Sequence, residues 1–186
     1  MRLRCLLLDR DGVINVDSTD YILDVDEWNP IPGSLEAIAK LTHAGIRVAV
    51  CTNQSAVGRG MLSGETLERI HGRMREAIIA AGGQLSGIFF CPHVPEARCN
   101  CRKPAPGLIQ QALEELNCAA DAALFIGDSR RDLEAARRAG VEAWLVRTGN
   151  GRATEVSLTD RPAVYDDLAS AAEKLLRDMN SPEPAA

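Results

Sequence analysis

Short apolar runs alternate with amphipathic segments along the chain. The apolar runs predict buried strands over residues 3–8, 46–51, 87–90, 123–126 and 143–146, and a short edge strand over 163–165. Apolar positions at helical spacing predict helices over residues 34–44, 63–81, 106–116, 131–139 and 167–179. This alternation predicts an α/β fold with a doubly wound parallel sheet that helices cover on both faces. Because ligands of such sheets bind beyond the carboxyl ends of the strands, the polar residues that follow each strand are the candidates for chemistry.

The length of 186 residues predicts one domain over residues 1–179, followed by a disordered tail over 180–186. No apolar run approaches the roughly 20 residues that a membrane helix needs, and the net charge of −5 differs from the basic excess of nucleic-acid-binding proteins. We therefore expect neither a membrane nor a nucleic acid as partner. A monomer that acts on a small molecule is expected from the open site without a cap domain that is described below. Six cysteines without a signal-peptide pattern indicate a reducing compartment, the cytoplasm, where clustered thiols are more often metal ligands than disulfides.

Two carboxylates, Asp9 and Asp11, directly follow the first predicted strand. Packed together they would repel each other, and Mg²⁺, which prefers oxygen ligands, removes that conflict. One carboxylate can then attack an electrophile while the other gives or takes a proton. A structural turn is the alternative, because Asp and Gly favour turns. A calcium-binding loop is excluded, because its sixth and twelfth positions require Gly and Glu but are Ile14 and Asp20.

Three further polar side chains occupy comparable positions. Thr52 follows the second predicted strand, Lys103 precedes a predicted helix and Asp128 follows the fourth strand. Taken singly, they are an ordinary strand-end hydroxyl, a solvated lysine and a turn or cap residue. Together with the acidic pair they supply a nucleophile, a proton carrier, a further acidic metal ligand, a hydroxyl donor and a cation. This set matches phosphoryl transfer, in which positioning and charge neutralisation provide most of the catalysis.

The order of these residues resembles the haloacid dehalogenase-like (HAD) phosphatases, whose D-x-D, Thr or Ser, Lys and G-D motifs all occur here between residues 6 and 132. The resemblance implies that Asp9 is the nucleophile that forms an aspartyl-phosphate, and that Asp11 is first the acid and then the base. It also implies that Asp9, the backbone carbonyl of Asp11 and Asp128 hold Mg²⁺, while Thr52 and Lys103 bind the phosphoryl group. Dehalogenase members lack the second aspartate, so dehalogenation is not expected.

A second cluster, Cys91, His93, Cys99 and Cys101, has the pattern C-x-H-x5-C-x-C. Three thiolates and one imidazole are a typical tetrahedral set for structural Zn²⁺, with no open position for catalysis. The alternative is a group of free thiols beside a surface histidine. The remaining cysteines are predicted to be buried core residues: Cys5, Cys51 and Cys118.

This zinc loop narrows the resemblance to the heptose-1,7-bisphosphate phosphatase family, which shares these traits with the histidinol-phosphatase domain. The stretches that carry the resemblance are residues 9–17, 52–55, 91–93 and 99–104. It implies a sugar bisphosphate substrate, cleavage of its 7-phosphate and a role in making heptose for surface glycans. Histidinol phosphate or another small sugar phosphate is the alternative substrate. The chain departs from the family pattern in two places. Its zinc loop is short, and Ser129 occupies a position where some members have a lysine that faces the substrate. Arg130 or Arg131 would supply that positive charge here.

The segments 11–52 and 52–103 are too short for the separate cap domain that many HAD phosphatases insert there. We therefore predict an open site that is fenced by loops over residues 15–28 and 53–61 and by the zinc loop. Arginines in these loops suit bidentate contacts to a second phosphate of the substrate. The polar loop residues either hydrogen-bond to sugar hydroxyls or simply belong to a solvated loop. The predicted substrate-binding residues are Asp17, Ser18, Thr19, Asp20, Asn53, Gln54, Ser55, Arg59, Arg102 and Ser129.

Two functions outside enzymology use similar residues. A phosphate-receiver module also places acidic residues, Thr and Lys at strand ends, but its phosphorylated aspartate follows a later strand, and here the third strand ends at Cys91. A zinc-bearing interaction domain would leave Asp9, Asp11 and Asp128 without a role. A metal-dependent phosphatase accounts for both clusters.

Overall fold

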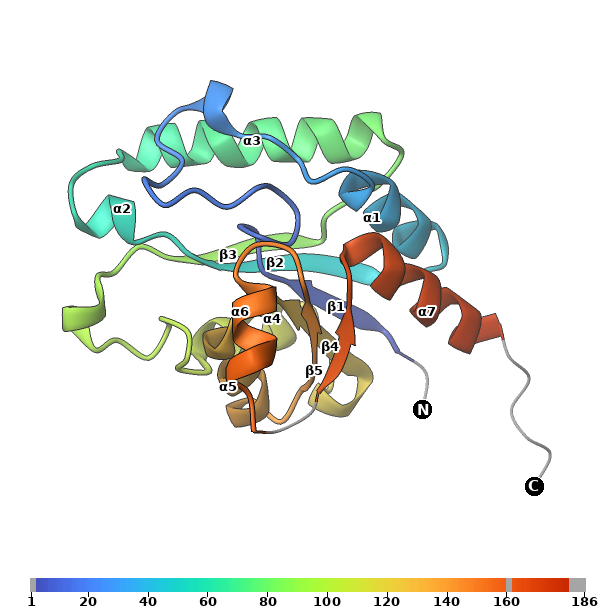
Figure 1. Ribbon diagram of the computed structural model, residues 1–186. Coiled ribbons are helices and arrows are strands. Elements are labelled where there is room, and N and C mark those ends of the chain that lie inside the picture. The colour runs from blue at the N-terminus through green and yellow to red at the C-terminus, as the bar shows by residue number, and fades with distance from the viewer. Residues whose placement is uncertain (1–2, 160–161, 181–186) are drawn as a thin grey trace.

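The computed structural model describes residues 3–159 and 162–180. Its centre is a sheet of six strands in the order β3-β2-β1-β4-β5-β6, and every neighbouring pair is parallel (Figure 1). The strands are β1 (Cys5–Leu8), β2 (Arg47–Asn53), β3 (Gly87–Cys91), β4 (Ala123–Gly127), β5 (Glu142–Val146) and β6 (Ala163–Tyr165). Leu7 of β1 pairs with Ala49 of β2 on one side and with Phe125 of β4 on the other. This sheet confirms the predicted fold class.

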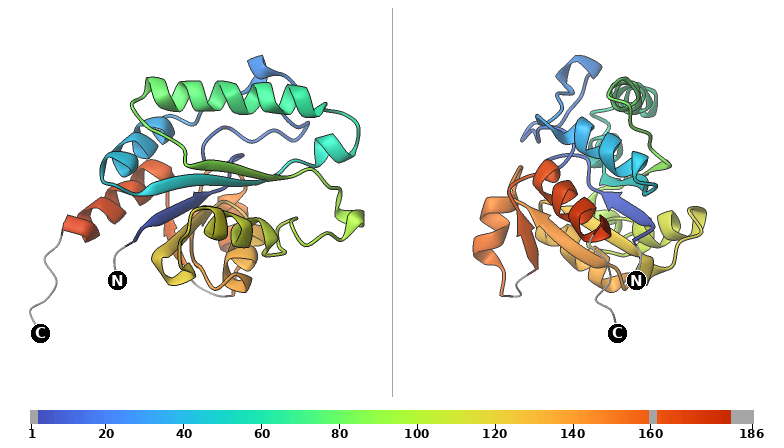
Figure 2. Two further views of the ribbon diagram at one scale, coloured as in Figure 1. Left: turned by 180° about the vertical axis from the view of Figure 1, so that it is seen from behind. Right: turned by 90° about the vertical axis from the view of Figure 1, so that its right-hand side faces the viewer.

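Helices cover the sheet on both faces (Figure 2). Helices α1 (Ser34–His43), α3 (Gly64–Ala80) and α7 (Leu168–Asn180) pack on one face, whereas α4 (Gly107–Glu115) and α5 (Arg130–Arg138) pack on the other. Successive strand residues point to opposite faces. In β1, Leu6 and Leu8 accordingly join the first helix layer, while Cys5 and Leu7 join the second. Because both faces are covered, the strands are apolar at nearly every position.

The observed elements begin and end within two residues of the predicted ones, with two additions. Helix α2 (Ser55–Gly58) lies in a segment that was expected to be a loop, and α6 (Gly151–Ser157) follows β5. Both are too short for apolar periodicity to reveal. Short 3-10 helices also occur: η1 (Val25–Glu27), η2 (Pro95–Ala97) and η3 (Ala120–Ala122). The prediction that residues 53–61 form only a loop is therefore wrong.

The chain carries no cap domain within the described residues. Only η1 and α1 lie between β1 and β2, and only α2 and α3 lie between β2 and β3. Residue 180 belongs to α7, and the rest of the predicted tail, 181–186, lies outside the described residues. Among the described helices, none is both long and apolar enough to cross a membrane. Among the described residues, loops and the short helices α2 and α6 follow the carboxyl ends of the strands (Figure 1).

Candidate active site

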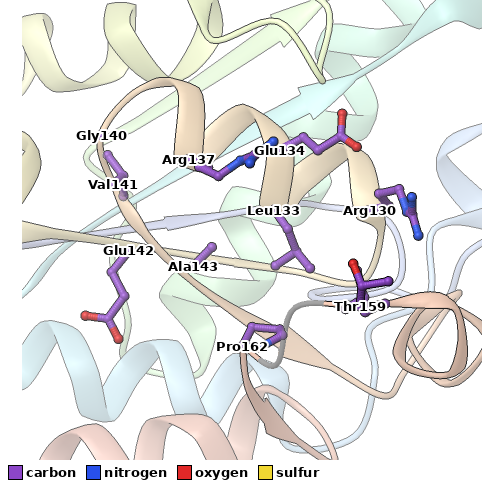
Figure 3. Close-up of a pocket in the computed structure, with 11 residues that line it drawn as sticks. Arg130, Leu133, Glu134, Arg137, Gly140, Val141, Glu142, Ala143, Thr159 and Pro162 are labelled. Carbon is purple, nitrogen blue, oxygen red and sulfur yellow. The ribbon is translucent and has the colours of Figure 1, made fainter.

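A cavity of about 480 Å³ opens beyond the carboxyl ends of β1, β2 and β4. Nearly all residues that the sequence selects for catalysis, magnesium and substrate binding line it, together with others that it does not select. The lining residues are Asp9, Arg10, Asp11, Asp17, Ser18, Thr19, Tyr21, Ile22, Thr52, Asn53, Gln54, Ser55, Arg59, Pro95, Arg102, Lys103, Asp128, Ser129, Arg131, Asp132 and Asn150. Asp20 lies outside this cavity, in a neighbouring hollow beside Leu23 and Glu27. A larger cavity of about 650 Å³ lies between α5, β5 and Pro162, and none of the predicted site residues line it (Figure 3).

Asp11 is held in place by three side chains. Arg10 is almost wholly buried and donates from Nε and Nη2 to Asp11 Oδ1, at 3.0 and 2.9 Å. Asn15 donates to the same oxygen at 2.9 Å, and Gln54 donates to Oδ2 at 2.9 Å. Burial opposes ionisation of Asp11, but the positive charge of Arg10 and these hydrogen bonds outweigh it and lower the pKa of the carboxyl. The second acidic residue of the pair is therefore oriented and ionised.

Asp9 lies at the end of β1, where its backbone N–H donates to the carbonyl of Ile126 at 3.0 Å. Its Oδ1 accepts from the backbone N–H of Arg10 at 2.7 Å and lies 2.9 Å from Nζ of Lys103. Burial raises the pKa of Asp9 to about 8, against the opposing effect of Lys103 and with the help of neighbouring carboxylates such as Asp132. A cation bound here would reverse that shift.

Lys103 is fully enclosed rather than solvated. Its Nζ lies 2.6 Å from Asp132 Oδ1 as well as 2.9 Å from Asp9, and 5.3 Å from the ring centroid of Phe125. Burial alone would lower the pKa of Lys103, but the two carboxylates more than compensate and raise it. Asn53 fixes the backbone of this lysine, because its Oδ1 accepts from Lys103 N at 3.1 Å and its Nδ2 donates to Lys103 O at 3.0 Å. The site thus contains a permanent, positioned cation.

The carboxylates of Asp9, Asp128 and Asp132 bring oxygen atoms within 4.8 Å of one another, which suits a divalent cation. Asp132 is also engaged elsewhere, since its Oδ2 accepts from the backbone N–H and the hydroxyl of Ser129 at 3.0 and 2.6 Å. Burial and the charge of Asp132 raise the pKa of Asp128 to about 6. Three buried or half-buried carboxylates beside a single lysine leave an excess of negative charge. Because both oxygens of Asp132 are engaged, by Lys103 and by Ser129, Asp9 and Asp128 are the members of this set that fit Mg²⁺.

The four predicted zinc ligands converge at the end of β3. Sγ of Cys101 lies 3.2 Å from Sγ of Cys91 and 3.3 Å from Sγ of Cys99, and Nδ1 of His93 lies 3.2 Å from Sγ of Cys101. Ligand atoms of all four residues lie within 4.8 Å of one another. Zinc–sulfur bonds of about 2.3 Å give ligand separations of this order in a tetrahedron. The geometry fits a closed structural zinc site.

The three other cysteines are buried and unpaired, as the sequence predicted for core residues. Cys5 and Cys51 face the second helix layer from β1 and β2, and Cys118 packs in the same layer. No disulfide occurs among the described residues.

Several polar residues that line the cavity also hydrogen-bond to other groups of the site. Gln54 is buried and donates to Thr52 Oγ1 at 3.0 Å as well as to Asp11, so its amide orders the pocket wall. Arg102 donates to the carbonyl of His93 at 3.1 Å, which ties it to the zinc loop. Of the two arginines considered as replacements for a lysine at position 129, Arg131 lines the cavity. Arg130 instead lines the larger cavity and donates to the carbonyl of Ser157 at 2.6 Å (Figure 3).

Sequence reasoning missed four residues of the site: Arg10, Asn15, Asp132 and Asn150. A signal existed for Asp132, because S-x-x-D at 129–132 is a capping-box pattern, and the structure forms that box at the start of α5. Asn150 donates from its backbone N–H to Asp128 at 2.7 Å and follows the fifth predicted strand closely. Nothing in the sequence indicates that the Arg10 side chain is buried, because arginine side chains are usually exposed.

Comparison with known proteins agrees with this geometry. Residues 100–171 match the HAD-hydrolase-like family model. The chain is 48% identical over 173 residues to the D-glycero-β-D-manno-heptose-1,7-bisphosphate 7-phosphatase of Pseudomonas aeruginosa, covering 92% of this chain and 97% of that protein. The Pseudomonas putida enzyme of the same name is 45% identical, with 94% and 100% covered.

Solved structures give the same result. The D,D-heptose 1,7-bisphosphate phosphatase from B. bronchiseptica, solved with magnesium and phosphate, superposes with a TM-score of 0.91 at 44% identity, covering 95% of this chain and 99% of that one. The corresponding enzyme from Burkholderia thailandensis superposes with a TM-score of 0.74 at 38% identity, with 93% and 98% covered. Near-complete coverage at these identities, together with the four HAD motifs, shows that the chain belongs to the heptose-1,7-bisphosphate 7-phosphatase family of HAD-like hydrolases.

Proposed function

We propose that the chain is a Mg²⁺-dependent phosphatase that removes the 7-phosphate of D-glycero-β-D-manno-heptose 1,7-bisphosphate. The observation that carries this proposal is the contact of Lys103 with Asp9 beside an oriented Asp11. The similar proteins from two Pseudomonas species are named as phosphatases of this bisphosphate. Asp9, Asp128 and the backbone carbonyl of Asp11 would hold Mg²⁺. The metal would neutralise charge on the transferring phosphoryl group and on the attacking carboxylate.

In the first step a carboxylate oxygen of Asp9 attacks phosphorus and the bond to the sugar oxygen breaks, while Asp11 gives its proton to that oxygen. The product on the protein is an aspartyl-phosphate at Asp9. Arg10 keeps the pKa of Asp11 low while the site is empty, and the negative charge of an arriving phosphate ester raises it, so that Asp11 can carry the proton. In the second step Asp11 takes a proton from water, the water oxygen attacks phosphorus, and Asp9 is released with inorganic phosphate. Thr52 and Lys103 hold the phosphoryl oxygens throughout.

Three arginines in the cavity favour a substrate with two phosphate groups over one that carries a phosphate group and an ammonium group. Arg59, Arg102 and Arg131 all line the cavity, and among the described residues no side-chain hydrogen bond or ion pair engages the guanidinium groups of Arg59 and Arg131. Guanidinium groups bind phosphate through paired hydrogen bonds and repel an ammonium group. Histidinol phosphate, which carries an ammonium group, is therefore the poorer fit. Zinc would act indirectly, since the zinc loop carries Arg102 and leads into Lys103.

The proposal is tested by steady-state hydrolysis of both heptose bisphosphate anomers and of histidinol phosphate with Mg²⁺. We expect the highest kcat/KM for the β-anomer and at least about tenfold less for histidinol phosphate. Asp9→Asn should form no phosphorylated protein in a rapid acid quench, whereas wild type should. Equal turnover of wild type and Asp9→Asn would overturn Asp9 as nucleophile, and preference for histidinol phosphate would overturn the substrate. The protein is expected to act as a monomer, and its free thiols fit the reducing cytoplasm.

A further inference from the structure

Asn150 lies between two carboxylates that belong to different parts of the site. Its Nδ2 is 2.9 Å from Oδ2 of Asp17 and 3.1 Å from Oδ2 of Asp128, and its backbone N–H donates to the same oxygen of Asp128 at 2.7 Å. Asp17 lies in the loop that follows β1, whereas Asp128 follows β4. A side-chain amide has two N–H hydrogens, so it can serve both acids at once. The nearby charge of Asp17 also raises the pKa of Asp128, and an amide between them offsets that repulsion.

The segment that carries Asn150 is itself fixed. Thr148 Oγ1 donates to the carbonyl of Gly12 at 2.6 Å. Gly12 and Gly149 both have positive φ, 78° and 55°, and a Cβ on either would overlap the carboxyl group of Asp128. The loop after β5 therefore packs closely against the D-x-D loop and presents Asn150 in one orientation.

The loop around Asp17 has little else to hold it. Asp17 Oδ1 accepts from the backbone N–H of Ser18 at 2.9 Å, and Ser18 Oγ accepts from the N–H of Asp20 at 3.2 Å, so these bonds stay inside the loop. Within residues 3–159 and 162–180, the hydrogen bond from Asn150 is the only one that joins residues 17–20 to a different strand-end loop. Three residues of this loop, Asp17 to Thr19, line the substrate cavity.

We propose that Asn150 is a positioning residue that couples the substrate loop to the metal site. By donating one amide hydrogen to each carboxylate, it turns Asp128 so that its second oxygen is free for the metal and keeps residues 17–20 at the rim of the cavity. This inference rests on the proposed function, because it takes Asp128 as a magnesium ligand and residues 17–19 as substrate contacts.

Hydrogen exchange of the metal-free protein tests the link without any substrate. Asn150→Ala and Asp17→Ala should each speed amide exchange over residues 17–21, by about threefold to tenfold for one lost charge-assisted bond. The double variant should exchange no faster than Asp17→Ala alone, because Asp17→Ala already removes the bond to Asn150 together with the bond from Asp17 to the backbone N–H of Ser18. Additive effects, or unchanged exchange in Asn150→Ala, would overturn the proposal.

Calorimetric titration with Mg²⁺ tests the second half of the link. Asn150→Ala should weaken Mg²⁺ binding by about threefold to tenfold, and Asp17→Ala should weaken it less, because both donors to Asp128 remain. Equal weakening in the two variants would overturn a direct action on Asp128. At saturating Mg²⁺, KM for heptose bisphosphate should rise in Asn150→Ala while kcat stays within about threefold.

Asn29→Ala is the matched control. Asn29 is exposed and donates one hydrogen bond, to the carbonyl of Glu27 at 3.0 Å, so it should change neither the exchange of residues 17–21 nor Mg²⁺ binding. If Asn150→Ala does not fold, Asn150→Leu, which has a similar shape without the amide hydrogens and adds no charge, replaces it in both measurements. Loss of hydrolysis in wild type with exchange and Mg²⁺ binding as expected would count against the proposed function and leave the coupling intact.

Discussion

Lys103 and Asp132 form an ion pair that is closed off from water, with Nζ 2.6 Å from Oδ1 and exposures of 2% and 1%. A buried charge that loses its partner is costly, by about 3–5 kcal/mol in measured cases. Asp132 also caps α5 through Ser129, so it links the lysine to the helix that follows β4.

We expect Asp132→Ala to lower the free energy of unfolding by several kcal/mol, up to about 5 kcal/mol, with the remaining contact to Asp9 limiting the loss. Activity should fall as well, because Lys103 loses one of the two groups that fix its position. Urea unfolding at pH 7 measures the stability. The control is Glu134→Ala on the same helix, whose pair with Arg138 spans 3.7 Å at the surface and should contribute less than about 1 kcal/mol. Similar losses in the two variants would contradict the assignment.

Magnesium binding should release protons. Burial raises the pKa of Asp9 to about 8 and that of Asp128 to about 6, so at pH 7 the metal-free site holds a proton that the metal must displace. The apparent affinity for Mg²⁺ should therefore rise between pH 6 and pH 8. Calorimetry at pH 7 in buffers of different ionisation enthalpy measures the number of protons released. A binding enthalpy that is the same in all buffers would show that the carboxylates are already ionised.

Removal of zinc should affect substrate binding before it affects the chemical step. Cys101→Ser takes away one ligand, and the adjacent Arg102 and Lys103 would lose their fixed backbone. We expect loss of zinc by elemental analysis, a lower melting temperature and a raised KM for the bisphosphate. Cys118→Ala is the control, since Cys118 is a buried cysteine outside the cluster and its variant should retain zinc. Protein that contains no zinc when purified without chelator would contradict the site.

His71 should make the fold sensitive to acid. Burial, with the positive charges of Arg10 and Arg75, lowers the pKa of its imidazole from 6.5 to about 3. Above pH 6.5 the ring is neutral whether the chain is folded or not, and its contribution to stability is complete. Below pH 6.5 the unfolded chain gains a proton that the folded chain excludes, so the free energy of unfolding falls by about 1.4 kcal/mol per pH unit.

Replacement of His71 by Met should remove that part of the pH dependence between pH 6.5 and pH 4. Urea unfolding across this range measures it as a shallower decline in the variant than in wild type. His43→Gln serves as the control, because His43 is exposed at the end of α1. A parallel decline in wild type and His71→Met would rule out the buried imidazole as the cause.

The strands and the longer helices could be predicted because their signals are local. Ser63 illustrates this, since its side chain accepts from Thr66 N at 3.0 Å as a helix cap should. The strand-end positions of Asp9, Thr52 and Asp128 followed from the parallel sheet, which gathers the carboxyl ends of strands that are far apart in sequence.

The support of the site could not be predicted in the same way. Asn53 and Gln54 line the cavity, as expected for residues near the substrate, and they also hydrogen-bond to Lys103 and to Asp11, which the sequence does not indicate. Their positions are local, whereas their partners are set by tertiary contacts across 50 and 43 residues of sequence. Asp20 was expected at the site too, but it lines a neighbouring hollow instead of the cavity that holds Asp9.

The close approach of Gly12 to Gly149 has a consequence for the evolution of new specificities. Neither position accepts a side chain without displacing Asp128. Substitutions at either glycine should therefore impair the enzyme, whichever phosphate ester is the substrate. Arg59 and Arg131 line the cavity, and among the described residues no side-chain hydrogen bond or ion pair engages their guanidinium groups, so they carry no such constraint. A mutational library aimed at other phosphate esters should therefore hold both glycines constant and vary the rim, and adaptation in natural lineages is expected to have followed the same route.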